Sequence, residues 1–143
     1  MRLTSRGRYA VSAMVDLARH GAGEPVCVAV VARRQGISPA YLERLFRQLR
    51  QQGLLRSTRG ARGGYRLGRG VAGITVSDVL NAVGESLDAT ACGSLDACGD
   101  DERCGTHGLW AGLTRHVEDY LGAITLAELD ARSAAAPTTL ESA

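Results

Sequence analysis

One run of the sequence constrains the fold more than any other, because it places two helix signals, a turn and a hairpin signal in direct succession. Residues 28–34 (VAVVARR) predict a helix that Gly36 breaks. Ser38 and Pro39 open the next helix, since serine caps helix N-termini and proline is tolerated in the first turn. Residues 54–67 then predict two short strands joined by an arginine- and glycine-rich loop. This order of elements predicts a winged helix-turn-helix.

The remainder of the chain also carries mainly helix signals. Helices are expected over 5–20, 74–83, about 104–121 and 126–132, with Thr4 or Ser5 capping the first and Thr125 the last. The expected fold class is therefore mainly α, with a small β-hairpin wing. By range, we expect a winged helix-turn-helix domain at 1–70, a second part at 71–131 that holds a loop (86–107) and a long helix, and a disordered tail at 132–143.

Charge is divided unevenly between the two halves of the chain. Residues 1–70 hold fourteen arginines and three acidic residues, a formal charge of +11, although the whole chain carries only +2. Residues 71–143 hold three arginines and twelve acidic residues, which gives −9. Such asymmetry indicates a polyanionic partner for the first half. Arginine, the only cationic residue besides histidine here, binds phosphate and guanine through two parallel hydrogen bonds.

The basic half therefore predicts an interface with double-stranded DNA, in preference to a merely solvated basic face. The second helix of such a fold lies in the major groove, while the wing holds the backbone. Glu43 has two interpretations: it selects bases, by accepting from cytosine or by excluding other sequences, or it only pairs with Arg47 at i,i+4. The residues expected at the DNA are Ser38, Tyr41, Glu43, Arg44, Arg47, Arg59, Gly60, Arg62, Gly63, Gly64 and Tyr65.

A second constellation gathers four metal-ligand side chains in one loop, with the spacing C-x₅-C-x₅-C-x₂-H: Cys92, Cys98, Cys104 and His107. Thiolate and imidazole bind zinc, copper or iron–sulfur clusters. Structural zinc sites usually separate paired ligands by about two to four residues, so these wider gaps favour a cluster. Zinc and a metal-free thiol switch remain the alternatives. Cys27 lies in an apolar run, and we interpret it as a buried core residue outside this site.

The long helix after the loop carries an apolar stripe that fits either a core or a dimer seam. We expect a dimer interface, because symmetric DNA sites favour two-fold dimers. The residues expected there are Leu109, Trp110, Leu113, Val117, Tyr120 and Leu121.

Several classes of protein are disfavoured. No apolar run approaches the roughly 18 residues of a membrane span, and the N-terminal residues lack a signal-peptide pattern. We therefore expect a cytoplasmic location, where clustered cysteines indicate metal or redox chemistry more often than disulfides. No glycine-rich nucleotide loop, serine triad or carboxylate pair indicates an enzyme.

Four segments together carry a resemblance: MRLTSRGRYAV at the start, QGIS-x-x-YLE at 35–43, RG-x-x-GGY-x-L at 59–67 and the cysteine–histidine loop. Over about residues 1–131 the chain resembles the IscR-like family of bacterial winged-helix repressors that bind iron–sulfur clusters. It differs from many relatives at Ala40, Arg44 and Ala61-Arg62, which bear on the DNA sequence preferred.

The resemblance implies a homodimeric transcription regulator with one 2Fe–2S cluster per chain, held by Cys92, Cys98, Cys104 and His107. It implies repression of cluster-assembly genes when the cluster is loaded, through a pseudo-palindromic operator, and a second class of sites for the apo form. The cluster-assembly machinery would donate the cluster.

Overall fold

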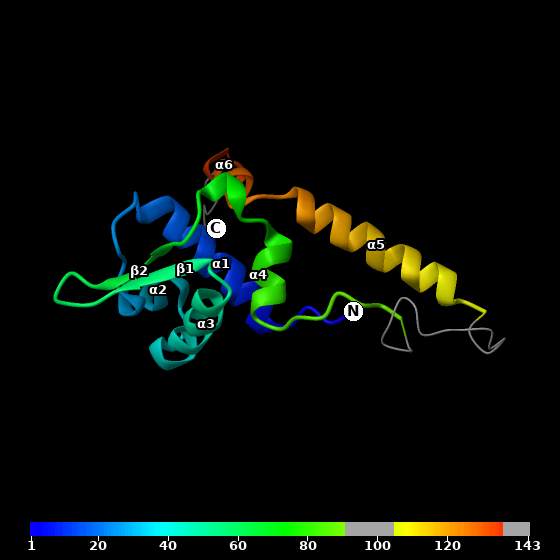
Figure 1. Ribbon diagram of the computed structural model, residues 1–143, viewed down its shortest axis with the longest axis horizontal. Helices are drawn as coiled ribbons and strands as arrows, with labels where there is room; N and C mark the ends of the chain where they lie inside the picture. Colours follow the sequence, from blue (N-terminus) through cyan, green and yellow to red (C-terminus); the bar gives the residue numbers. More distant parts are fainter. Residues whose placement is uncertain (91–104, 136–143) are drawn as a thin grey trace, which may run out of the picture.

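The computed structural model describes residues 1–90 and 105–135, and it confirms a mainly α fold with one small antiparallel sheet (Figure 1). The elements run in the order α1 (Ser5–His20), α2 (Val28–Gln35), α3 (Pro39–Gln51), β1 (Leu55–Thr58), β2 (Gly64–Leu67), the 3-10 turn η1 (Val71–Gly73), α4 (Val76–Ala82), α5 (His107–Ala123) and α6 (Leu126–Ala135).

The helix-turn-helix of α2 and α3 forms where the local signals placed it. Gly36 ends α2 with φ +65°, a left-handed conformation that glycine adopts without steric cost. The Ser38 hydroxyl accepts the Tyr41 amide at 3.4 Å, and Pro39 occupies the first helical position of α3. The apolar stripe of α3 is fully buried: Leu42, Leu45, Phe46 and Leu49 are at most 1% exposed.

The wing is the hairpin of β1 and β2, whose register pairs Arg56 with Arg66 and Ser57 with Tyr65. At its tip Gly60 has φ +110°, a backbone conformation that glycine adopts without steric cost. The backbone of β2 also pairs with Val26, because the amides of Val26 and Tyr65 each donate to the other's carbonyl at 2.8 Å. The hairpin is therefore fixed to the segment before α2.

One main core joins both halves of the sequence. Its buried residues come from α1, α2, α3 and the hairpin, and also include Ile74, Val79, Val83 and Leu126. A smaller cluster of Val76, Leu80, Leu87 and Ile124 lies where α4 meets α5. The two parts that we predicted on either side of residue 70 therefore differ in charge but share one core.

Helix α5 projects from the body formed by the other helices, as Figure 1 shows. It begins at His107, three residues after the predicted start near 104. Helix α6 is capped by Thr125 as predicted, since that hydroxyl accepts the Glu128 amide at 3.2 Å. The helix continues to Ala135, so the first residues of the predicted tail are helical, as their alanines favour. Residues 136–143 of that tail lie outside the described part.

Cys27 corrects a prediction. It occupies the N-cap position of α2 with an exposed side chain, and the prediction of a buried core residue was wrong. The apolar run around it places its buried residues later, at Val31 and Ala32.

Candidate DNA interface and metal-ligand loop

The exposed side of α3 carries free arginines. Arg44 and Arg47 are both exposed, and within the described chain neither makes an ion pair. Tyr41 is half-buried and its ring meets that of Tyr9 edge-on, with centroids 6.1 Å apart. The exposed side of α3 is therefore positively charged, and the opposite side is packed in the core.

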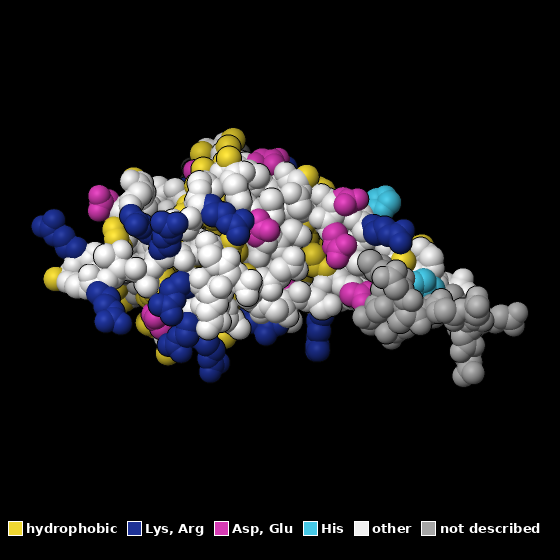
Figure 2. Space-filling view, viewed as in Figure 1, with side chains coloured by type: hydrophobic (Ala, Val, Ile, Leu, Met, Phe, Trp, Pro, Cys, Tyr) yellow, Lys and Arg dark blue, Asp and Glu magenta, His cyan; other side chains and the backbone are white. Residues whose placement is uncertain are grey.

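The wing tip continues this surface. Arg59, Gly60 and Arg62 are exposed, whereas Gly63 and Gly64 are partly covered. A Cβ atom at Gly64 would lie 2.3 Å from the Val26 carbonyl oxygen, so this glycine serves the close approach of two backbones. In Figure 2 the arginine side chains gather around the hairpin and α3, while acidic side chains are more frequent toward α4 and α5.

Tyr65 connects the wing to α3 from below the surface. It is only 7% exposed, and its ring packs edge-on against Phe46 with centroids 5.1 Å apart. Its hydroxyl donates to the Glu43 carboxylate at 2.9 Å. Burial raises the pKa of the Tyr65 hydroxyl, and the bond to Glu43 raises it further. Of the described residues, Tyr65 and not Arg47 is the partner of Glu43.

Three arginines of the basic half have internal partners that the sequence did not reveal. Arg34 meets the buried Asp16 at 2.5 Å and holds α2 against α1. Arg19 meets Asp130 of α6 at 3.0 Å, and Arg6 meets Glu85 at 3.3 Å. These three stabilise the fold and are less available to DNA than the arginines of α3 and the wing.

The metal-ligand loop is described only at its two ends. Cys92, Cys98 and Cys104 lie outside the described residues, and His107 is the half-buried first residue of α5. In residues 1–90 and 105–135 there is no group of three or more side chains suited to hold a metal. The Ala89 amide, shortly before the loop, donates to the buried Thr114 hydroxyl of α5 at 2.9 Å.

Asp88 also lies just before the loop. Hydrogen bonds from the Thr90 hydroxyl and amide lower the pKa of Asp88. Through the bond from Ala89, the segment before the loop lies beside the middle of α5.

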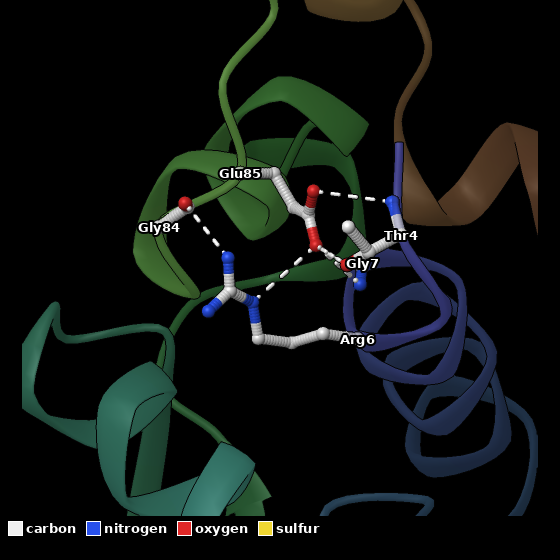
Figure 3. A network of polar contacts seen from close by, with 5 residues as sticks. All are labelled: Thr4, Arg6, Gly7, Gly84 and Glu85. Carbon is white, nitrogen blue, oxygen red and sulfur yellow. Dashed lines mark hydrogen bonds and ion pairs between the residues drawn. The ribbon is translucent and has the colours of Figure 1, made fainter. Parts of the chain in front are cut away.

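The same segment also reaches the N-terminus of α1 through Glu85 (Figure 3). The Glu85 side chain is 1% exposed, and its carboxylate accepts the Gly7 amide at 3.0 Å and the Thr4 amide at 3.2 Å. The Thr4 hydroxyl and the Arg6 guanidinium also donate to it. Thr4 holds the N-cap position but makes no capping bond of its own. Glu85 thus caps α1 from the far half of the chain.

Burial by itself raises the pKa of Glu85, but the hydrogen bonds from Thr4, Gly7 and Arg6 outweigh it and hold that pKa below 4.5. The approach is close, because a Cβ atom at Gly7 would lie 2.8 Å from the Glu85 Cγ atom. A larger residue at position 7 would have to displace the side chains of Glu85 and Leu80, and no local sequence pattern indicates this contact.

The predicted dimer stripe of α5 divides into two groups. Leu109, Trp110, Leu113 and Tyr120 are 38–63% exposed, whereas Val117 and Leu121 pack on the smaller core cluster. The Trp110 ring nitrogen donates to the Thr106 hydroxyl at 3.2 Å, which fixes the indole near the helix start.

Sequence comparison places this geometry among known regulators. The chain is 53% identical over 129 residues to the HTH-type transcriptional regulator IscR of Erwinia tasmaniensis, covering 90% of this chain and 78% of the relative. It is 51% identical over 129 residues to the regulator of the same name from Xenorhabdus nematophila, covering 90% and 79%. These relatives are named as transcriptional regulators and not as enzymes.

Solved structures of transcriptional regulators have the same fold as this chain. The global cysteine regulator CymR of B. subtilis superposes with a TM-score of 0.79 at 29% identity, covering 92% of this chain and 98% of CymR. IscR of T. potens gives 0.75 at 33% identity, covering 100% and 94%. No described helix is long and apolar enough to cross a membrane. The family pattern of the iron-dependent transcriptional regulators called Rrf2 matches residues 3–132, and the chain therefore belongs to the Rrf2 family.

Proposed function

We propose that this regulator senses iron–sulfur clusters, binds operator DNA as a homodimer, and acts mainly as a repressor of cluster-assembly genes. The observation that carries the proposal is the donor set Cys92, Cys98, Cys104 and His107, whose last member opens α5. Relatives named IscR, at 51–53% identity, support it. The regulator would work in the cytoplasm, with the cluster-assembly machinery as donor.

The donor set fits a 2Fe–2S cluster, one per chain. Three thiolates and one imidazole complete the terminal ligands of its two irons, and the five-residue gaps are wider than those usual in structural zinc sites. When bound, such a cluster supplies a group whose presence depends on iron and oxidants. A histidine ligand can be protonated, and we infer that His107 makes the cluster easier to lose than a fourth cysteine would.

The described ends of the loop supply a route from cluster to DNA. Ala89 is bonded to Thr114 of α5, and four positions earlier Glu85 caps α1. Helix α1 packs against α3 in the main core. Binding of a cluster would thus bias α1 and α5 together, and a ligand shifts such an equilibrium only by its different affinity for the two states.

At the DNA, we propose that α3 lies in the major groove and the wing tip holds the backbone. Arg44 and Arg47 would meet the duplex from α3, and Arg59 and Arg62 from the wing; Ser38, Tyr41 and the tip glycines would contact the backbone. Because Tyr65 is buried, its contribution would be to fix the carboxylate of Glu43.

A second copy of the chain is the proposed partner of α5. Leu109, Trp110, Leu113 and Tyr120 lie exposed on a helix that projects from the body, and in the described chain only Ala111 and Thr114 of α5 are buried. A stripe of large apolar side chains this exposed marks an interaction site. A two-fold dimer would cover the stripe of both copies and space the two DNA surfaces on a pseudo-palindromic operator.

The test is anaerobic purification followed by elemental analysis, an absorption spectrum and operator binding of holo and apo protein. We expect a red-brown protein with iron and acid-labile sulfide, and operator binding that changes when the cluster is removed. A colourless protein with one zinc per chain would establish the zinc-stabilised alternative, and a metal-free protein whose DNA binding follows thiol oxidation would establish the thiol switch.

His107→Cys tests the histidine. We expect slower cluster loss in air than in the unchanged protein, measured by the decay of visible absorbance. His116→Cys, nine residues later on α5, is the matched control and should leave the decay unchanged. Equal decay in all three proteins would remove His107 from the ligand set.

A further inference from the structure

The wing carries a like-charged pair that the fold does not explain. Arg56 of β1 and Arg66 of β2 are direct cross-strand partners, and both are exposed. Like charges directly opposite each other destabilise a sheet. Within the described residues neither arginine makes an ion pair.

These arginines lie on the face of the hairpin that points away from α3. Side chains alternate between the two faces of a strand, and the next pair, Ser57 and Tyr65, faces α3. Tyr65 bonds Glu43 there, and Ser57 accepts from Arg50 of α3 at 3.3 Å. The Arg56–Arg66 face is therefore a second surface, separate from the one described above.

The second surface borders a hollow of about 470 Å³ between the hairpin and the turn after α1. Arg69 joins the other two arginines in lining it, and Leu17, Leu67 and Val71 supply apolar wall. Glu24 is the acidic residue of the lining, and it is exposed and makes no ion pair with described residues. Three guanidinium groups around one hollow fit a phosphate-bearing ligand.

We propose that this outer wing face binds the DNA backbone outside the stretch that α3 reads. The proposal rests on the DNA binding set out above and adds a contact to it. In that complex the wing tip holds the backbone, and the hairpin face with Tyr65 is turned toward α3. The opposite face, with Arg56 and Arg66, is therefore turned toward the backbone strand beyond the tip.

Arg69 extends the contact along that strand. It follows β2 and lines the same hollow, so the three guanidinium groups present a short basic row beside the tip arginines Arg59 and Arg62. Contacts of this kind carry no base information, and their effect is affinity, salt dependence and a longer footprint.

The test compares the full chain with the double variant Arg56→Ala/Arg66→Ala on two duplexes, one limited to the operator and one extended at both ends. Arg115→Ala, on exposed α5, is the matched control for loss of arginine. We expect the unchanged protein to gain affinity on the extended duplex, and the double variant to lose that gain. Raising salt from about 50 to 200 mM should weaken the unchanged protein roughly a hundredfold more than the variant, since each phosphate contact contributes about −0.9 to the slope and the variant dimer lacks two arginines in each protomer.

Thermal unfolding without DNA separates this role from a structural one. The double variant should be as stable as the unchanged protein or more so, because it removes the repulsion between Arg56 and Arg66. Equal salt slopes and equal gain from the extended duplex would overturn the proposal. Stabilisation of the unchanged protein but not the variant by inorganic phosphate, with DNA binding equal in both, would assign the site to a free anion and also overturn it.

The same two duplexes distinguish failure of DNA binding as a whole from failure of the outer wing contact. If the unchanged protein bound neither duplex, DNA binding itself would be refuted, whereas binding by the unchanged protein and the variant alike refutes only the outer wing contact.

Discussion

Helices α3 and α5 carry similar apolar patterns, but the chain buries the stripe of α3 and leaves much of the stripe of α5 exposed. The stripe of α3, which includes Leu45 and Phe46, is at most 1% exposed. The stripe of α5 leaves Leu109 at 63% and Tyr120 at 61% exposed. Periodicity alone marks an apolar face, and it does not say whether the cover comes from the same chain.

The charged sides of the two helices complete the contrast. The exposed side of α3 carries Arg44 and Arg47, whose charges can bind a polyanion. The apolar side of α3 is buried in the core of the same chain. In α5, by contrast, much of the apolar side is exposed. We therefore expect α3 to use its charged side at DNA and α5 to use its apolar side against a second copy.

Among substitutions that test this difference between α3 and α5, we expect the largest effect in the buried stripe of α3. Phe46→Ala should lower the free energy of unfolding by about 3 to 5 kcal/mol, because it leaves a cavity under Tyr65 and removes a side chain that is fully buried. Urea unfolding measures it. Arg44→Ala, on the exposed side of the same helix, is the control and should change stability by less than about 0.5 kcal/mol.

Truncation on α5 should act on association instead. Trp110→Ala should weaken the dimer by about 2 to 4 kcal/mol, since large aromatic side chains dominate the energy of interfaces. Sedimentation over a range of concentrations measures it, with Arg115→Ala as a control for the side of α5 away from Leu113. An unchanged protein that sediments as a monomer at all concentrations would contradict the dimer.

Glu85→Gln probes the connection between the two halves. It should lower the free energy of unfolding by about 1 to 2 kcal/mol at neutral pH, because the α1 cap loses its charge. The folded-state pKa of Glu85 lies below its ordinary 4.5, so its contribution is present above that pH and is lost as pH falls through the folded-state value.

The unchanged protein should therefore lose stability in acid more steeply than the variant. Stability curves in urea at several pH values measure this, with the exposed Glu118→Gln as control. Parallel pH profiles for the unchanged protein and Glu85→Gln would show that the carboxylate contributes no such linkage.

The smallest expected effect is at the wing tip. Arg59→Ala should leave stability unchanged and reduce the magnitude of the log–log salt slope of operator binding by about 1.8, the loss of one phosphate contact from each protomer of the dimer. Fluorescence anisotropy over a salt series measures it. An unchanged slope and affinity would remove Arg59 from the interface.

The sequence predicted the first three helices and the wing well because their signals are local. Ser38-Pro39 and Gly36 act within one turn of the chain, and the α3 stripe has a clear period. The predicted end of α6 and the predicted burial of Cys27 were wrong. Helix α6 continues through Ser133, Ala134 and Ala135, because alanine favours the helix even without cover. The burial of Cys27 depends on which neighbours cover a short apolar run, and composition does not determine that.

The candidate sites divide in the same way. Residue type and spacing predicted the four ligands and the wing arginines, and these stay predictions. The bond from Tyr65 to Glu43 and the cap from Glu85 to Gly7 join residues 22 and 78 positions apart. No local pattern encodes such pairs, so only the assembled fold reveals them.

The cap on α1 has a consequence for how the chain acquires its fold. The N-terminal turn of α1 receives its acceptor from 78 residues downstream, and the main core waits for Leu126 of α6. Contacts so distant in sequence close long loops and form late. During synthesis α1 emerges first and is finished among the last, so the basic first half reaches its final form only after the acidic second half has been made.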